Sequence, residues 1–202
     1  MKKLILKTAT IFILTATVFN SKAQNSLSLR WGHFVPVNSK LNNAFTNSNA
    51  FSIGFLHPLS KSDFSVGLTL SHQEYRSKDH FFSDAYATKL HIHNYLITAR
   101  YDFINKATLY LYASTDAGLN KSKSRELKGG VKKEFQNTGI TTGISFGADM
   151  AISQRTLLGA NIQSQYSYIQ SMQFDERVCV NNATSVAANI GVRFLLGTKR
   201  IN

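Results

Sequence analysis

The sequence predicts an all-β protein, an eight-stranded antiparallel up-and-down transmembrane β-barrel that follows a cleavable signal peptide. Three observations lead to this prediction: an N-terminus typical of exported proteins, an alternation of apolar and small polar residues that recurs eight times, and connections that alternate between long and short. No stretch of the remaining chain approaches 18 consecutive apolar residues, so any membrane span must be built from strands.

The first 23 residues have the three-part layout of a secretory signal peptide. Three lysines precede an apolar run over residues 8–19, and small residues stand at the −3 and −1 positions of a cleavage site after Ala23. The apolar run is shorter than the roughly 20 residues that a helical membrane anchor needs. We therefore expect residues 1–23 to be removed and residues 24–202 to form one barrel domain.

Eight later segments alternate apolar residues with small or polar ones, which is the period of a strand with two different faces. Within residues 137–151, for example, Ile144 and Phe146 share one face, whereas Gly143 and Ser145 share the other. This alternation predicts strands at residues 26–34, 50–57, 63–75, 89–103, 107–120, 137–151, 155–169 and 183–195.

The connections between these strands alternate strictly in length. Short turns are expected at residues 58–62, 104–106 and 152–154, and long loops at residues 35–49, 76–88, 121–136 and 170–182. This alternation is typical of outer-membrane barrels, which have short periplasmic turns and longer external loops. The even number of strands places both ends of the barrel domain on the periplasmic side.

The polar face consists mainly of Gly, Ser, Thr and Asn, which suits a closed interior better than a solvated exterior. Three arginines and three aspartates on this face have a net charge of zero, so we expect ion pairs in the lumen. These residues are Arg30, Arg100, Asp102, Asp116, Asp149 and Arg193. Two tyrosines, Tyr110 and Tyr112, should fill space that the glycines leave, because eight strands enclose little more than side chains.

The apolar face should contact lipid, and its aromatic residues gather toward the two ends of the strands. We expect a periplasmic aromatic girdle of Phe55, Phe64, Tyr101, Phe103 and Phe194. The corresponding external girdle is expected to consist of Phe51, Tyr95, Tyr166 and Tyr168.

The opening strand at residues 27–32, the glycine-rich alternation around Gly143 and Gly147, and the closing strand at residues 189–194 resemble a known family. They are similar to the small eight-stranded outer-membrane β-barrels of Gram-negative bacteria, the OmpA-like and OmpX-like barrels. The resemblance implies an outer-membrane location, assembly by the barrel-insertion machinery, a monomer, and a non-enzymatic role in envelope structure or in surface interaction through the external loops. Residues 195–202 depart from members that end on an aromatic residue.

The net charge is +12, and four of the lysines belong to the signal peptide, so the barrel domain carries +8. Six basic residues lie in the expected loop 121–136, and on the outer surface they would contact the phosphates of lipopolysaccharide. They are Lys121, Lys123, Arg125, Lys128, Lys132 and Lys133. The alternative is a solvated loop without a partner. Nucleic acid is not an expected partner, because the chain is exported and has no recognition motif.

Two further functions stay open, a lipid A-modifying enzyme and a narrow channel. Ser71, His72 and Glu74 stand at the height where such enzymes place a serine, a histidine and an acid, but adjacent strand residues point to opposite faces. His91 and His93 share a face, yet their spacing suggests no third metal ligand. We therefore expect no catalytic residues, no metal and no cofactor.

Overall fold

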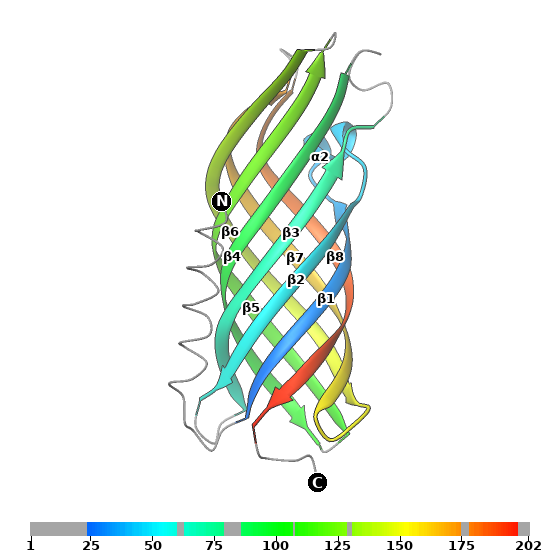
Figure 1. Ribbon diagram of the computed structural model, residues 1–202, viewed down its shortest axis with the longest axis vertical. Helices are drawn as coiled ribbons and strands as arrows, with labels where there is room; N and C mark the ends of the chain where they lie inside the picture. The colour runs from blue at the N-terminus through cyan, green and yellow to red at the C-terminus, as the bar shows by residue number, and fades with distance from the viewer. Residues whose placement is uncertain are drawn as a thin grey trace.

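The computed structural model describes residues 24–59, 63–78, 86–106, 108–128, 131–174 and 178–197. The predicted signal peptide and its cleavage site lie outside these residues. The described residues form a closed antiparallel barrel in which each strand pairs with its neighbours in sequence (Figure 1). The strands are β1 (Asn25–Pro36), β2 (Ser48–Pro58), β3 (Phe64–Arg76), β4 (Tyr86–Asn105), β5 (Leu109–Lys128), β6 (Val131–Ala151), β7 (Thr156–Phe174) and β8 (Val178–Leu196). The predicted fold class is confirmed.

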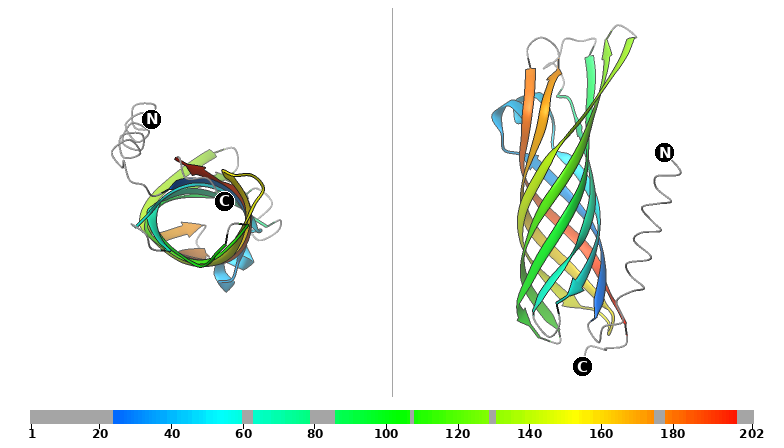
Figure 2. Two further views of the ribbon diagram at one scale, coloured as in Figure 1. Left: turned by 90° about the horizontal axis from the view of Figure 1, so that it is seen from below. Right: turned by 90° about the vertical axis from the view of Figure 1, so that its left-hand side faces the viewer.

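The ladder between the first and last strands closes the sheet. β1 and β8 pair antiparallel from Asn25, opposite Leu196, to Pro36, opposite Ser185. The view along the barrel axis shows the resulting ring (Figure 2). A closed sheet has no edge, so the strands pair their own backbone groups within a lipid layer that offers no hydrogen bonds.

The two faces of the strands differ as the alternation predicts. On the exterior, Phe146 is 62% exposed and Ile162 is 66% exposed. Their chain neighbours Ser145 and Asn161 point inward and are only 2% and 6% exposed. This distribution is the reverse of that in a water-soluble protein, so the exterior band requires lipid around it.

Two of the predicted external loops are wrong, because strands occupy most of them. β5 continues to Lys128 and β6 begins at Val131, so residues 121–136 form the upper part of a paired hairpin rather than a loop. β7 and β8 also continue into the predicted loop 170–182. Above the lipid both faces of a strand can carry polar side chains, so these extensions lack the apolar alternation that reveals a strand in the sequence.

The predicted loop 35–49 contains a short helix, α2 (Ser39–Ala44). Leu41, Ala44 and Phe45 are fully buried in one apolar cluster with inward-facing side chains near the external ends of the strands. Those side chains are Tyr75, Leu90, Ile92, Ile169 and Ala183. The interior is therefore apolar toward its external end and polar in the middle. Within the described residues, no helix has the length and apolar character needed to cross a membrane.

The face assignment leads to a test at neighbouring residues of β6. Replacing Ile144, which is 54% exposed on the lipid face, with arginine (Ile144→Arg) should lower the free energy of unfolding by about 2–4 kcal/mol. Ser145→Ala should cost about 1 kcal/mol, because it removes one neutral hydrogen bond with Ser114. Denaturant unfolding in lipid vesicles, followed by the fluorescence of the single tryptophan, Trp31, measures both values. Equal stability of Ile144→Arg and the parent would show that this face does not meet lipid.

Candidate functional site

A cluster of buried charges lies in the periplasmic half of the lumen, on β4, β6 and β8. Arg100 is 1% exposed, and its Nε donates to Asp102 Oδ1 at 2.8 Å. Its Nη1 lies 2.8 Å from Asp149 Oδ2, and Nη1 of Arg193 lies 3.4 Å from the same oxygen. Two arginines and two aspartates are thus brought together, and their charges compensate where isolated charges would be very costly.

The ring of Tyr112 completes the packing of this part of the lumen. The guanidinium of Arg100 lies 3.6 Å from the ring centroid, and that of Arg30 lies 5.5 Å from it. Gly147 stands directly opposite Tyr112 on β6, and a Cβ there would approach the Tyr112 hydroxyl to 2.5 Å. The glycine therefore makes room for the ring, which packs against both guanidinium groups.

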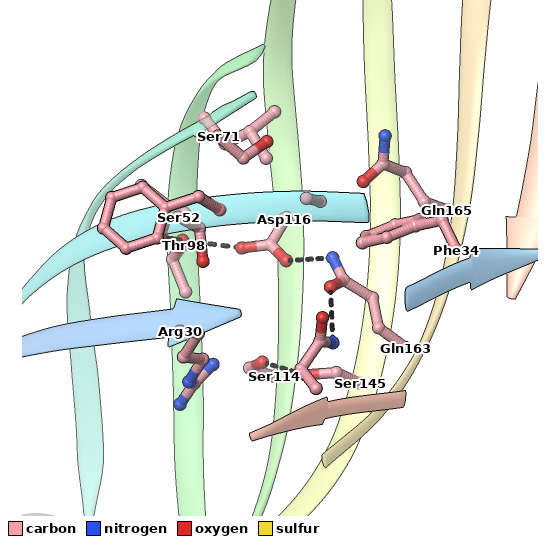
Figure 3. A pocket seen from close by; sticks show the side chains of 15 residues that line it. Arg30, Phe34, Ser52, Ser71, Thr98, Ser114, Asp116, Ser145, Gln163 and Gln165 are labelled. Atoms are coloured by element: carbon pink, nitrogen blue, oxygen red, sulfur yellow. Dashed lines mark hydrogen bonds between the residues drawn. The ribbon is translucent and has the colours of Figure 1, made fainter. Parts of the chain in front are cut away.

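The remaining pair of expected lumen charges does not form an ion pair. Asp116 accepts a 2.6 Å hydrogen bond from Thr98 and a 3.5 Å hydrogen bond from Gln163. Among the described residues, no cation lies within 4.0 Å of its carboxylate. Arg30 and Asp116 instead line a cavity of about 40 Å³, which is room for only a few water molecules (Figure 3).

On the exterior, the apolar face ends along a line that crosses β3, β4 and β5. The strand register aligns Leu70, Tyr95 and Leu119. The next residues on the same face, toward the external end of each strand, are His72, His93 and Lys121. Beyond that line the same face carries charged side chains. We call this surface the basic wall, and it consists of Arg76, Lys89, Lys121, Lys123 and Arg125 with Glu74 and Glu134.

The acidic residues of the basic wall each hold more than one cation. Glu134, on the extension of β6 beyond the lipid band, pairs with Lys123 and lies 3.8 Å from Arg125 Nε. The hydrogen bond from Lys123 lowers the pKa of the Glu134 carboxyl group below its ordinary value. Lys121 is exposed and has no acidic group within 4.0 Å among the described residues, so the wall keeps an excess of positive charge.

The other three predicted lipopolysaccharide contacts, Lys128, Lys132 and Lys133, lie at the tip of the β5–β6 hairpin. Their backbones belong to the strands, and their side chains lie outside the described part of the structure.

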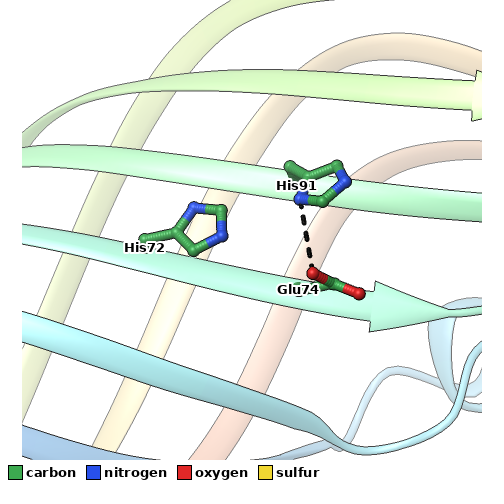
Figure 4. A group of neighbouring side chains, drawn as sticks. All are labelled: His72, Glu74 and His91. Carbon is green, nitrogen blue, oxygen red and sulfur yellow. Dashed lines mark ion pairs between the residues drawn. The ribbon is translucent and has the colours of Figure 1, made fainter.

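The serine and histidine considered for catalysis are separated by the sheet. Ser71 faces the lumen, where its Oγ accepts a 2.9 Å hydrogen bond from Asn94, whereas His72 lies on the exterior. His72, Glu74 and His91 instead gather on the outer surface of β3 and β4 (Figure 4). The sequence did not reveal this group, because the pairing of Glu74 with His91 depends on the β3–β4 register, which the intervening residues do not determine visibly.

Solved structures of other proteins superpose on this barrel over most of its length. The Neisserial surface protein A superposes with a TM-score of 0.55 and 17% identity, over 87% of this chain and 98% of that protein. The chain has the fold of the small outer-membrane β-barrels. Ail of Yersinia pestis, in complex with the heparin analogue sucrose octasulfate, has a TM-score of 0.54 and 12% identity, over 87% of this chain and all of Ail. For OprG of Pseudomonas aeruginosa the TM-score is 0.52, with 12% identity over 87% of this chain and 97% of OprG.

No protein-family model matches the sequence, and no curated protein matches it at a significant level. The shared fold and the exposed apolar band agree on an outer-membrane location.

The lumen cluster predicts a large effect for one carboxylate and a small effect for another. Asp149→Asn leaves Arg100 and Arg193 with Asp102 as the only acidic group of the cluster, and loss of one partner from a buried ion pair costs about 3–5 kcal/mol. Asp116→Asn keeps a carbonyl oxygen that accepts from Thr98, so it should cost about 1 kcal/mol or less. Denaturant unfolding in vesicles measures the free energy of unfolding of both variants. Equal losses would show that the ion pairs of Asp149 contribute no more to stability than the neutral hydrogen bonds of Asp116.

The packed lumen also predicts that the barrel does not conduct ions. Arg100 and Tyr112 are almost completely buried, and the cavity between Arg30 and Asp116 is small. In planar lipid bilayers the purified barrel should give no stepwise conductance, while a porin inserted under the same conditions serves as the positive control. Reproducible current steps from the barrel alone would contradict the packing.

Proposed function

We propose that this chain is a non-enzymatic outer-membrane barrel whose basic wall binds the phosphate groups of lipopolysaccharide, and that it acts in the structure of the envelope. The observation that carries the proposal is the position of the basic wall. Its first residue, Lys121, is the next residue on the same face of β5 beyond the outermost lipid-facing residue Leu119, which pairs with Tyr95 of β4. Aromatic side chains such as Tyr95 prefer the level where acyl chains meet headgroups. Lys121 therefore stands next to the level of the lipid A phosphates.

The charge of the basic wall supports an anionic ligand. Five cations face two carboxylates, so the wall has a net charge of +3 with neutral histidines. Ammonium and guanidinium groups bind phosphate through charge-assisted hydrogen bonds. A Lys or Arg near an anionic membrane surface contributes about 1 kcal/mol to the attraction. Lys121, without an acidic partner in the described part, and Arg125, with only a 3.8 Å contact to Glu134, are the groups most available to a phosphate.

The interior supports a role without catalysis or transport. Ser71 and His72 lie on opposite faces of β3, so they do not form a nucleophile and base pair. In the described part of the lumen, almost completely buried side chains such as Arg100 and Tyr112 lie near a cavity of only about 40 Å³, which supports a packed interior over a channel. Ail, a barrel of the same fold, has been crystallised with the heparin analogue sucrose octasulfate, which shows that Ail accepts a polyanionic sugar. A phosphorylated glycolipid presents similar chemistry to the basic wall.

The proposal predicts that removing two cations of the basic wall weakens lipid A binding. The double variant Lys121→Gln/Arg125→Gln leaves the Lys123–Glu134 pair intact. It should bind phosphorylated lipid A about 30-fold more weakly, since two charges contribute about 1 kcal/mol each. The measurement is a titration of lipid A into the purified barrel in a neutral detergent at low salt. The difference should shrink at high salt, because exposed charges are then screened.

The matched control removes two positive charges at the periplasmic end. Lys106→Gln/Arg155→Gln changes the net charge by the same amount, and both residues are exposed near the short turns. This variant should bind lipid A as the parent does. Lipid A without its phosphates should bind to the parent and to both double variants with the same affinity. If the parent does not distinguish the two forms of lipid A, the basic wall does not recognise phosphate.

A further inference from the structure

We infer that His72, Glu74 and His91 form a binding site for a zinc-like divalent transition metal ion on the outer surface of β3 and β4. Glu74 belongs to the basic wall, but this inference does not rest on the proposed lipopolysaccharide contact, because the cations proposed to contact phosphate, Lys121 and Arg125, are not among the metal ligands. The three residues occupy adjacent outward positions in the register, where Glu74 stands directly opposite His91 and His72 is two residues from Glu74 on the same face.

The residue types match the ligand preferences of Zn²⁺. Neutral imidazole nitrogens and a carboxylate oxygen bind zinc at about 2.0–2.2 Å, and sites with three protein ligands keep one position for water. Imidazole also suits Cu²⁺ and Ni²⁺, whereas Ca²⁺ and Mg²⁺ prefer sites made only of oxygen. A site with two histidines and one carboxylate therefore selects a transition metal over the divalent cations that bridge phosphates.

The geometry brings the three ligand groups within reach of one ion. One ligand atom from each residue lies within 4.8 Å of the other two. Tetrahedral coordination requires about 3.4 Å between ligand atoms, so small rotations of these half-buried side chains suffice. The rings of His72 and His91 are stacked with centroids 5.6 Å apart, and Glu74 lies beside His91, with Oε2 3.9 Å from Nδ1 (Figure 4). The fixed backbone ladder on both strands holds these positions together.

Two observations show that the group has unused capacity to bind. Nδ1 of His72 is buried and has no hydrogen-bond partner among the described residues, so coordination of a metal would satisfy it. The ring of His93 lies with its centroid 4.5 Å from that of His72, next to the site. His93 is therefore a candidate fourth ligand in place of water.

The competing partners of Glu74 are easily displaced. Its carboxylate lies 3.1 Å from Arg76 Nε and 3.5 Å from Lys89 Nζ. The side chains of Arg76 and Lys89 are 70% and 49% exposed, and exposed ion pairs contribute little free energy. Both side chains can rotate into solvent when a divalent ion binds the carboxylate of Glu74.

The test is a zinc titration of the folded barrel in detergent micelles, without a polyhistidine tag and in a Cys179→Ser background that removes the thiol. Calorimetry should show one saturable Zn²⁺ site per chain. When Co²⁺ replaces Zn²⁺ in the same chain, the visible absorption should be that of a protein-bound cobalt ion with a low coordination number. His72→Ala, Glu74→Gln and His91→Ala should each weaken binding by more than about tenfold.

The matched control is His33→Ala, which removes an exposed histidine on the exterior of β1, far along the sheet from β4. It should bind zinc as the background chain does, and heat-modifiable gel migration should show that every variant is folded. Lys121→Gln/Arg125→Gln should also keep the zinc site, which separates this inference from the proposed function. The absence of saturable zinc uptake by the folded background chain would overturn the inference. Unchanged affinity in Glu74→Gln would overturn it as well.

Discussion

A strand that crosses lipid must find a partner for each of its backbone N–H and C=O groups, and the ladder between β1 and β8 meets this requirement for the whole sheet. Once the ring is closed, the backbone is fully used, and only the side chains remain to specify the interior and the exterior. The period of two then gives each strand one series of residues for the lumen and another for the lipid. The buried charges around Arg100 belong to the series that faces the lumen. The basic wall and the group of His72, Glu74 and His91 belong to the outer series.

The lumen and the exterior solve different problems with the same alternation. Inside, a narrow ring has to be filled without leaving charges uncompensated, and Gly147 and Tyr112 share the space beside Arg100 and Asp149. Outside, the lipid sets a sharp boundary between Leu119 and Lys121, two positions apart on one face. The inner series therefore stabilises the barrel, whereas the outer series beyond the lipid is free to bind ligands.

The sequence was sufficient for the strand number, the closed architecture and the identity of the two faces, because apolar residues at every second position report burial in lipid directly. It did not reveal the extensions of β5 and β6 to Lys128 and Val131, since strands surrounded by water need no apolar face. It placed Arg100, Asp102, Asp149 and Arg193 on the inner face, but only the register shows which of them meet. The group of His72, Glu74 and His91 depends on the same information, because its ligands come from two strands.

The apolar cluster around α2 joins a connection to the wall of the barrel. Leu41 and Phe45 come from the segment between β1 and β2, whereas Tyr75 and Ile92 face the lumen from β3 and β4, and all four are fully buried together. Exposing these side chains to water would cost free energy, so the segment is held against the strands. A core of the soluble-protein type, built at one end of a membrane barrel, thus makes this connection part of the folded domain.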